Sequence, residues 1–127
     1  MIVVDTSALM AIVLDEPAAE RCMAVLETED SLLISAGTLA EALIVGARRG
    51  IGEEIAELVA GVDLEVVPVT SASARRVADA YARWGKGIHP AALNFGDCFA
   101  YALAAEQDCP LLFVGSDFSS TDVKRAL

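Results

Sequence analysis

Short, uniformly apolar runs alternate with longer stretches of helical periodicity along the chain. The apolar runs predict strands at 2–4, 32–34, 64–69 and 111–114, because continuous aliphatic segments are typical of strands buried on both faces. Glycines and prolines delimit the helices expected between them, at 7–14, 18–27, 38–49, 52–60, 71–84 and 95–107, with one further helical turn from Ser119. This alternation predicts an α/β fold with a parallel sheet covered by helices on both faces.

Length and composition narrow the class of protein. The 127 residues suit a single domain, 1–127, and 55% of them are apolar, which predicts a sizeable core. The longest apolar run covers only 98–105, whereas a membrane span needs roughly 20 residues. The first residues lack a basic segment, and the cysteines are odd in number without a CxxC pair: Cys22, Cys98 and Cys109. We therefore expect a cytoplasmic protein without a secretory signal, disulfide framework or zinc-thiolate site.

The charge balance is strongly acidic. Nineteen acidic residues against nine basic ones give a net charge of −10, which argues against a protein that coats nucleic acid by neutralising phosphates. A nuclease stays compatible with this charge, because a site built of carboxylates adds negative charge that a divalent metal offsets.

Four acidic residues fall directly after a predicted strand or near the start of a predicted helix. They are Asp5, Glu41, Asp97, which follows Gly96, and Asp117. Because strand ends and helix starts share one edge of a parallel sheet, we expect these side chains to converge. Converging carboxylates repel one another unless a cation lies between them, and Mg²⁺ or Mn²⁺ prefers such oxygen ligands. The pattern predicts hydrolysis assisted by a divalent metal.

Each acid also has a purely structural explanation as a helix cap or a turn residue. These alternatives are an N-cap at Asp5, a capping box joining Thr38 and Glu41, a cap by Asn94 with Asp97 at the third helical position, and turn or cap residues at Asp117 and Asp122. The sequence leaves both explanations open for every acid taken alone.

The order of these motifs resembles the PIN domain, and more closely the VapC toxins of bacterial toxin–antitoxin modules. The motifs are Val4-Asp5-Thr6-Ser7-Ala8, Glu41 after the second strand, Phe95-Gly96-Asp97-Cys98, and the segment 112–122, so the resemblance spans the chain. It implies a three-layer α/β/α sandwich with a mainly parallel sheet of four to five strands, the fifth being absent or residual here. It also implies an endoribonuclease dependent on Mg²⁺ or Mn²⁺, with a VapB-type antitoxin, a homodimer and larger toxin–antitoxin assemblies.

The resemblance assigns roles to the acids residue by residue. Asp5, Glu41 and Asp97 match the three core metal-site acids, and Asp117 matches a fourth that varies more. Asp5 and Asp97 would hold the principal metal, and Glu41 would hold it through a water or polarise the attacking water. Asp117 would complete the shell or help position a second metal. The secondary candidates are the hydroxyl of Thr6 or Ser7, which would orient a ligand or water, and Asp122.

Basic and apolar side chains suggest contacts with partners. The bases that would guide RNA phosphates lie within 75–86, with a solvated helix face as the structural alternative: Arg75, Arg76, Arg83 and Lys86. His89 is expected to be a surface residue that a metal mechanism does not need. The apolar surplus at 8–14 and 40–47 indicates surface reserved for a second copy or for an antitoxin helix.

Other functions compete with this interpretation. A phospho-receiver domain needs an acid pair at the first strand, where Asp5 stands alone, and an Asp ending a central strand, where 67–69 has none. A PIN-like domain that only binds a partner, and a metal-dependent nuclease acting on DNA, both retain all four acids and need an activity assay to separate them.

Overall fold

The computed structural model describes all residues, 1–127, and contains one four-stranded parallel sheet. The strand order is β3-β2-β1-β4, formed by β1 (Ile2–Val4), β2 (Leu32–Ser35), β3 (Glu65–Val67) and β4 (Leu111–Leu112). All three pairings are parallel, which confirms the prediction. A fifth strand is residual, because a single parallel bridge joins Leu111 to Arg125.

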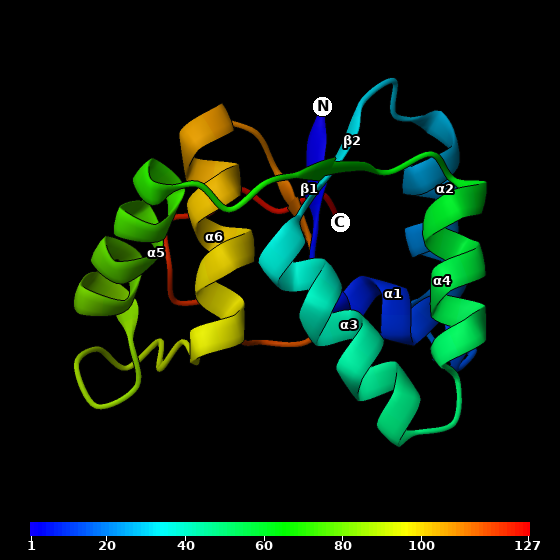
Figure 1. Ribbon diagram of the computed structural model, residues 1–127, viewed down its shortest axis with the longest axis horizontal. Helices are drawn as coiled ribbons and strands as arrows, with labels where there is room; N and C mark the ends of the chain where they lie inside the picture. Colours follow the sequence, from blue (N-terminus) through cyan, green and yellow to red (C-terminus); the bar gives the residue numbers. More distant parts are fainter.

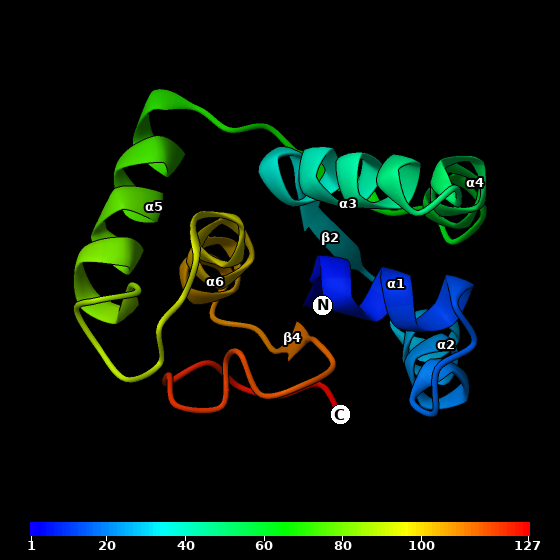
Figure 2. The same ribbon diagram turned by 90° about the horizontal axis from the view of Figure 1, so that it is seen from below.

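Six helices cover the sheet on both faces. They are α1 (Thr6–Val13), α2 (Ala19–Thr28), α3 (Ala36–Arg48), α4 (Gly52–Gly61), α5 (Ser71–Trp84) and α6 (Phe95–Gln107). Figure 1 and Figure 2 show α5 and α6 side by side on one face, and the other helices gathered on the opposite side. The three-layer α/β/α arrangement is therefore confirmed. None of the six helices combines the length and the hydrophobicity that a membrane span requires.

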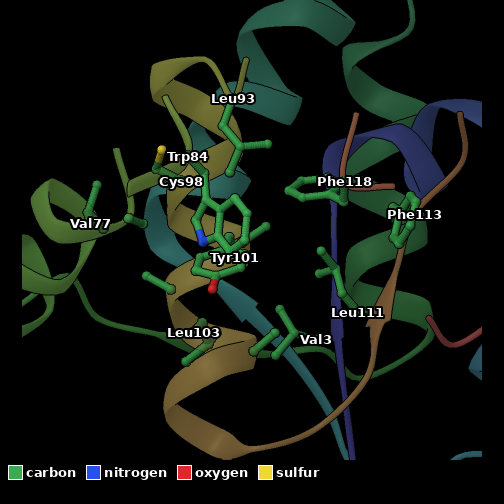
Figure 3. Packing of buried hydrophobic residues seen from close by; sticks show 14 of the residues in the cluster. Val3, Val77, Trp84, Leu93, Cys98, Tyr101, Leu103, Leu111, Phe113 and Phe118 are labelled. Carbon is green, nitrogen blue, oxygen red and sulfur yellow. The ribbon is translucent and has the colours of Figure 1, made fainter. Parts of the chain in front are cut away.

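The core consists of two clusters, one on each face of the sheet. Val3 and Leu33 belong to the cluster under α5 and α6, whereas Val4 and Ile34 belong to the cluster on the other face. Because successive side chains of a strand point to opposite faces, the continuous apolar runs of β1 and β2 are buried on both sides. Figure 3 shows the aromatic part of the first cluster, which includes Trp84, Tyr101, Phe113 and Phe118.

Two predicted strands are shorter than expected. The strand predicted at 64–69 is confined to Glu65–Val67, since Pro68 has no N–H to donate to a ladder. It is an edge strand, and Val66 is 41% exposed. The strand predicted at 111–114 stops at Leu112, and the N–H of Val114 bonds to the Ser7 hydroxyl instead of a neighbouring strand.

Two helix predictions were also wrong in detail. The predicted capping box of Thr38 and Glu41 does not form, because α3 begins earlier, at Ala36, with Ser35 as its N-cap. Thr38 is fully buried instead, and Glu41 lies in the second turn. No helical turn forms after Ser119, since the last residues bond to Leu111, whose N–H and C=O pair with the backbone of the tail.

Candidate functional site

Asp5 and Asp97 are both helix caps and buried acids at the carboxyl edge of the sheet. Asp5 follows β1 and is the N-cap of α1, accepting a hydrogen bond from the N–H of Ser7 at 3.0 Å. Asp97 lies in the first turn of α6, in a capping box with Asn94. Their exposures are only 4% and 8%. The structural explanation of these acids therefore holds, but it does not account for burying two charges side by side.

Glu41 reaches this edge from the second turn of α3. Its Oε1 accepts a 2.7 Å hydrogen bond from the hydroxyl of Thr6, at the start of α1. Its carboxylate lies against the backbone of Gly96, where an added Cβ would sit only 2.6 Å from Glu41 Cδ. Gly96 thus leaves the space that the Glu41 carboxylate occupies, and a side chain at this position would displace that carboxylate.

Asp117 completes the group from the exposed turn after β4. Burial is the main cause of the raised pKa of Asp97, and the charges of Asp5, Asp117 and Glu41 raise it further. The four acids that the sequence singled out therefore lie near one another, at the residue between β1 and α1, in α3, in α6 and in the turn after β4.

Burial is the largest influence on the pKa values of Asp5 and Asp97, the two inner acids of the site. It raises the pKa of Asp5 to about 6, against the hydrogen bonds from Ser7, which lower it. Burial also raises the pKa of Asp97 to about 6, against the Asn94 N–H, which lowers it, and the neighbouring carboxylates raise it further. Carboxylic acids that release their protons close to neutral pH are typical of functional sites.

Two hydroxyls next to Asp5 fix the geometry of the acids. The Ser7 hydroxyl donates to Asp5 Oδ2 at 2.6 Å and accepts the N–H of Val114 at 3.0 Å, which ties the end of β1 to the segment after β4. The Thr6 hydroxyl holds Glu41 instead. Both expected hydroxyl positions therefore contact an acid, each a different one.

The site fits a hard divalent cation by the chemistry of its donors. Asp5 Oδ1 is buried and has no hydrogen-bond partner, so one oxygen of this inner acid is left to a ligand. As the side chains stand, no three acidic, histidine or cysteine groups are close enough to coordinate one ion. Since Thr6 holds Glu41 and the carboxylates repel one another, binding an ion with three of them requires a side chain to turn inward.

Asp122 does not join the four acids. Its Oδ1 accepts a 2.5 Å hydrogen bond from the hydroxyl of Tyr101, in the middle of α6, and its Oδ2 lies 3.5 Å from Arg83 Nη1. Sequence reasoning missed Tyr101, because nothing in the chain links it to an acid twenty-one residues later.

Two of the four basic residues predicted to contact RNA form ion pairs with acidic residues of the chain, and two do not. Arg76 pairs with Glu106 at 3.3 Å, and Arg83 pairs with Asp122, whereas Arg75 and Lys86 form no ion pair. Glu106 lies near the end of α6, about 14 Å along that helix from Asp97 at 1.5 Å per residue. Arg76, which pairs with Glu106, is therefore distant from the acids. Lys86 follows α5, and its N–H donates to the carbonyl of Leu93 at 3.0 Å, just before the N-cap of α6.

His89 is half-buried and supports the loop between α5 and α6. Its Nδ1 accepts the N–H of Ala91 at 3.0 Å, and its ring packs edge-on against Trp84, with centroids 4.7 Å apart. Its contacts are those of a loop residue, in keeping with a mechanism that does not use it.

The raised acid pKa values predict that, in EDTA, the protein unfolds at a higher temperature at pH 5 than at pH 7.5. Folded Asp5 and Asp97 have pKa values of about 6 against 3.8 for an ordinary aspartate side chain, so the folded state binds protons that the unfolded state does not. This stabilisation is complete below about pH 4 and is lost as the pH rises through 6; for Asp5 it amounts to about 3 kcal/mol. Melting curves by circular dichroism at pH 5, 6 and 7.5 measure it, and a melting temperature that falls on acidification would contradict it.

A parallel α/β/α sandwich with four converging carboxylates has the architecture of a carboxylate-dependent nuclease. The chain belongs to the PIN-domain family, whose profile matches residues 2–124, and within it to the VapC ribonucleases. It is 46% identical over 126 residues to Ribonuclease VapC30 of Mycobacterium tuberculosis, with 95% of each chain covered. These findings confirm the resemblance seen in the motifs.

Two solved structures share the fold. The crystal structure of Mycobacterium tuberculosis VapC20, a sarcin-ricin loop cleaving toxin, superposes with a TM-score of 0.78 over 97% of this chain and 96% of that one, at 17% identity. A toxin–antitoxin complex from Klebsiella pneumoniae gives a TM-score of 0.71 over 96% and 93%, at 15% identity.

Proposed function

We propose that this protein is the toxin of a toxin–antitoxin module and cleaves RNA phosphodiester bonds with Mg²⁺ or Mn²⁺. The observation that carries the proposal is a buried, unpartnered oxygen of Asp5 at a sheet edge where the charges of Asp5, Asp117 and Glu41 all act on Asp97. The relative named as a ribonuclease, and the solved toxin that cleaves the sarcin-ricin loop, support RNA as the substrate.

Three acids would hold the metal. Asp5 and Asp97 are buried and fixed by hydrogen bonds at the starts of α1 and α6, and Glu41 reaches them from α3. When bound, a divalent cation neutralises charge that develops on the phosphate and lowers the pKa of water. Ser7 fixes the Asp5 carboxylate, and Thr6 keeps Glu41 at the same edge, where Glu41 would polarise the attacking water. Asp117 approaches from the solvent side and completes the acidic group.

Lys86 and Arg75 are the bases left without an acidic partner in the candidate RNA-binding group. Lys86 lies on the loop that leads into α6, so we assign it the contact with RNA phosphates next to the site. Arg76 and Arg83 would have to leave their acidic partners to make the same contact.

The partners proposed for this protein are a VapB-type antitoxin and a second copy of the chain, in the cytoplasm. Helix α3 exposes Leu43 and Ile44, to 38% and 60%, and a groove between α3 and α4 is lined by Leu39, Val59 and other apolar side chains. Such surface suits a partner helix. The solved toxin–antitoxin complex of the same fold supports an antitoxin, and the −10 charge favours a basic one.

The proposal predicts that purified, antitoxin-free protein cleaves total cellular RNA with Mg²⁺ and stops in EDTA. Asp97→Asn is expected to lower the rate at least about a hundredfold, because the amide keeps the capping box but not the charge that holds the cation. Asp63→Asn is the matched control, since Asp63 is exposed and its φ of 56° suits asparagine.

Fragment sequencing of the cleaved RNA identifies the target, and single-stranded and duplex DNA run in parallel test the other substrate. If folded protein supplied with Mg²⁺ or Mn²⁺ cleaves neither, the chain is a PIN-like binding module. Cleavage that persists in EDTA or in Asp97→Asn would remove the carboxylate-held metal from the mechanism.

A further inference from the structure

Asp122 ties the end of the chain to the two helices on one face of the sheet. It accepts the Tyr101 hydroxyl of α6 at 2.5 Å and lies 3.5 Å from Arg83 of α5. Tyr101 is itself held in the core, 6% exposed and packed edge-on against Trp84 (Figure 3). We call Asp122, Tyr101 and Arg83 the tail latch. It fastens the segment that follows Phe118 to α5 and α6.

The segment between the tail latch and Asp117 is short and internally bonded. Phe118 is 2% exposed and packs against Phe113, with ring centroids 5.1 Å apart. The N–H and hydroxyl of Thr121 both bond to the carbonyl of Phe118, at 3.1 and 2.7 Å. Any movement of Asp122 is therefore transmitted through one tight turn to Phe118, which adjoins Asp117.

Asp117 needs such a support. It is exposed, it comes shortly after Gly115, whose φ of 97° marks a turn, and its charge lies near that of Asp97. Repulsion between carboxylates pushes this turn away from the site. The Val114 N–H bond to the Ser7 hydroxyl holds the chain before Asp117, and Phe118 followed by the tail latch holds it after Asp117.

We propose that the tail latch is a positioning device for Asp117, with Asp122 and Tyr101 keeping the fourth acid at the metal site. This rests on the proposed function, in which Asp117 belongs to that site. Asp122 is thus a positioning residue and not a metal ligand. The main role of Arg83 is to pair with Asp122, and not to contact RNA.

Tyr101→Phe tests the proposal, because it removes the hydroxyl and keeps the buried ring. We expect the hydrogen-bonded amides of Ser119 and Thr121 to exchange about tenfold faster, since a hydrogen bond to a charged group is lost. The affinity for Mn²⁺, measured by calorimetry, should fall several-fold. For RNA cleavage, kcat should fall while KM stays unchanged.

Two further variants make the test decisive. Lys124→Gln is the control, because it removes another exposed contact of the tail, the 2.9 Å pair with Asp108, outside the latch; it should leave exchange, Mn²⁺ affinity and kcat as in the wild type. Asp122→Ala should resemble Tyr101→Phe. If Asp122→Ala abolishes Mn²⁺ binding while Tyr101→Phe leaves it intact, Asp122 is a ligand and the proposal is overturned.

Wild-type amide exchange and Mn²⁺ affinity in Tyr101→Phe would also overturn it. Both readouts are independent of catalysis, so a protein that binds Mn²⁺ but cleaves no RNA would refute the proposed nuclease activity and still test the latch.

Discussion

Replacing Asp5 with asparagine is expected to abolish RNA cleavage and at the same time to raise the melting temperature in EDTA at pH 7.5. Asparagine has the same shape and keeps an acceptor oxygen for the N–H and hydroxyl of Ser7. Burial of the charged carboxylate destabilises the folded protein, and the same burial raises the pKa of Asp5 to about 6. Removing the charge therefore removes this destabilisation. Because the amide N–H₂ takes the place of the unpartnered Oδ1, the net gain is reduced to about 1 kcal/mol.

This experiment separates the two explanations of Asp5. A residue that serves only as the N-cap of α1 would leave activity unchanged when its cap is preserved, whereas a metal ligand would lose at least about a hundredfold in rate. Thermal melts and cleavage of one defined RNA, with Asp63→Asn alongside, measure both quantities. A variant that is less stable than the wild type at pH 7.5 and still cleaves would show that Asp5 is structural.

The second large effect is expected from Gly96→Ala, which should disable the enzyme without unfolding it. The new Cβ would collide with the Glu41 carboxylate, whose Cδ would lie 2.6 Å away, so Glu41 must swing out of its hydrogen bond with Thr6. The carboxylate is the end of a flexible side chain, and alanine is a better helix former than glycine by about 1 kcal/mol. We expect an almost unchanged melting temperature and a loss of about tenfold to a hundredfold in kcat.

Gly61→Ala provides the matched control for Gly96→Ala, since it is also a helical glycine and its added Cβ meets nothing within 4 Å. It should be slightly more stable than the wild type and equally active. Comparing Gly96→Ala with Glu41→Gln completes the test. Similar losses of kcat would show that Gly96→Ala acts by displacing Glu41. Full activity in Gly96→Ala would mean that the position of Glu41 does not matter.

Local patterns in the sequence were sufficient to predict the helices and strands and the parallel arrangement of the sheet. The continuous apolar runs at β1 and β2 predicted strands buried on both faces, because a strand facing water on one side alternates. The cap by Asn94, with Asp97 at the third helical position, was predictable from spacing alone, as were the ends of α5 and α6. The same logic placed four acids on one edge, since parallel strands and the following helices meet there.

What the sequence could not determine are contacts between segments far apart in the chain. The pattern at Thr38 and Glu41 fits a capping box, but Ser35 caps α3 instead and frees Glu41 to reach Thr6 and Gly96.

Asp122 could have been a cap or a ligand, and only the folding of the tail over α6 brings it to Tyr101. Local spacing fixes the hydrogen bonds within a turn or a helix end. The sequence by itself therefore determined which acids lie at the edge of the sheet. The tertiary structure decided which neighbour holds each of them, because those neighbours meet only when the layers pack.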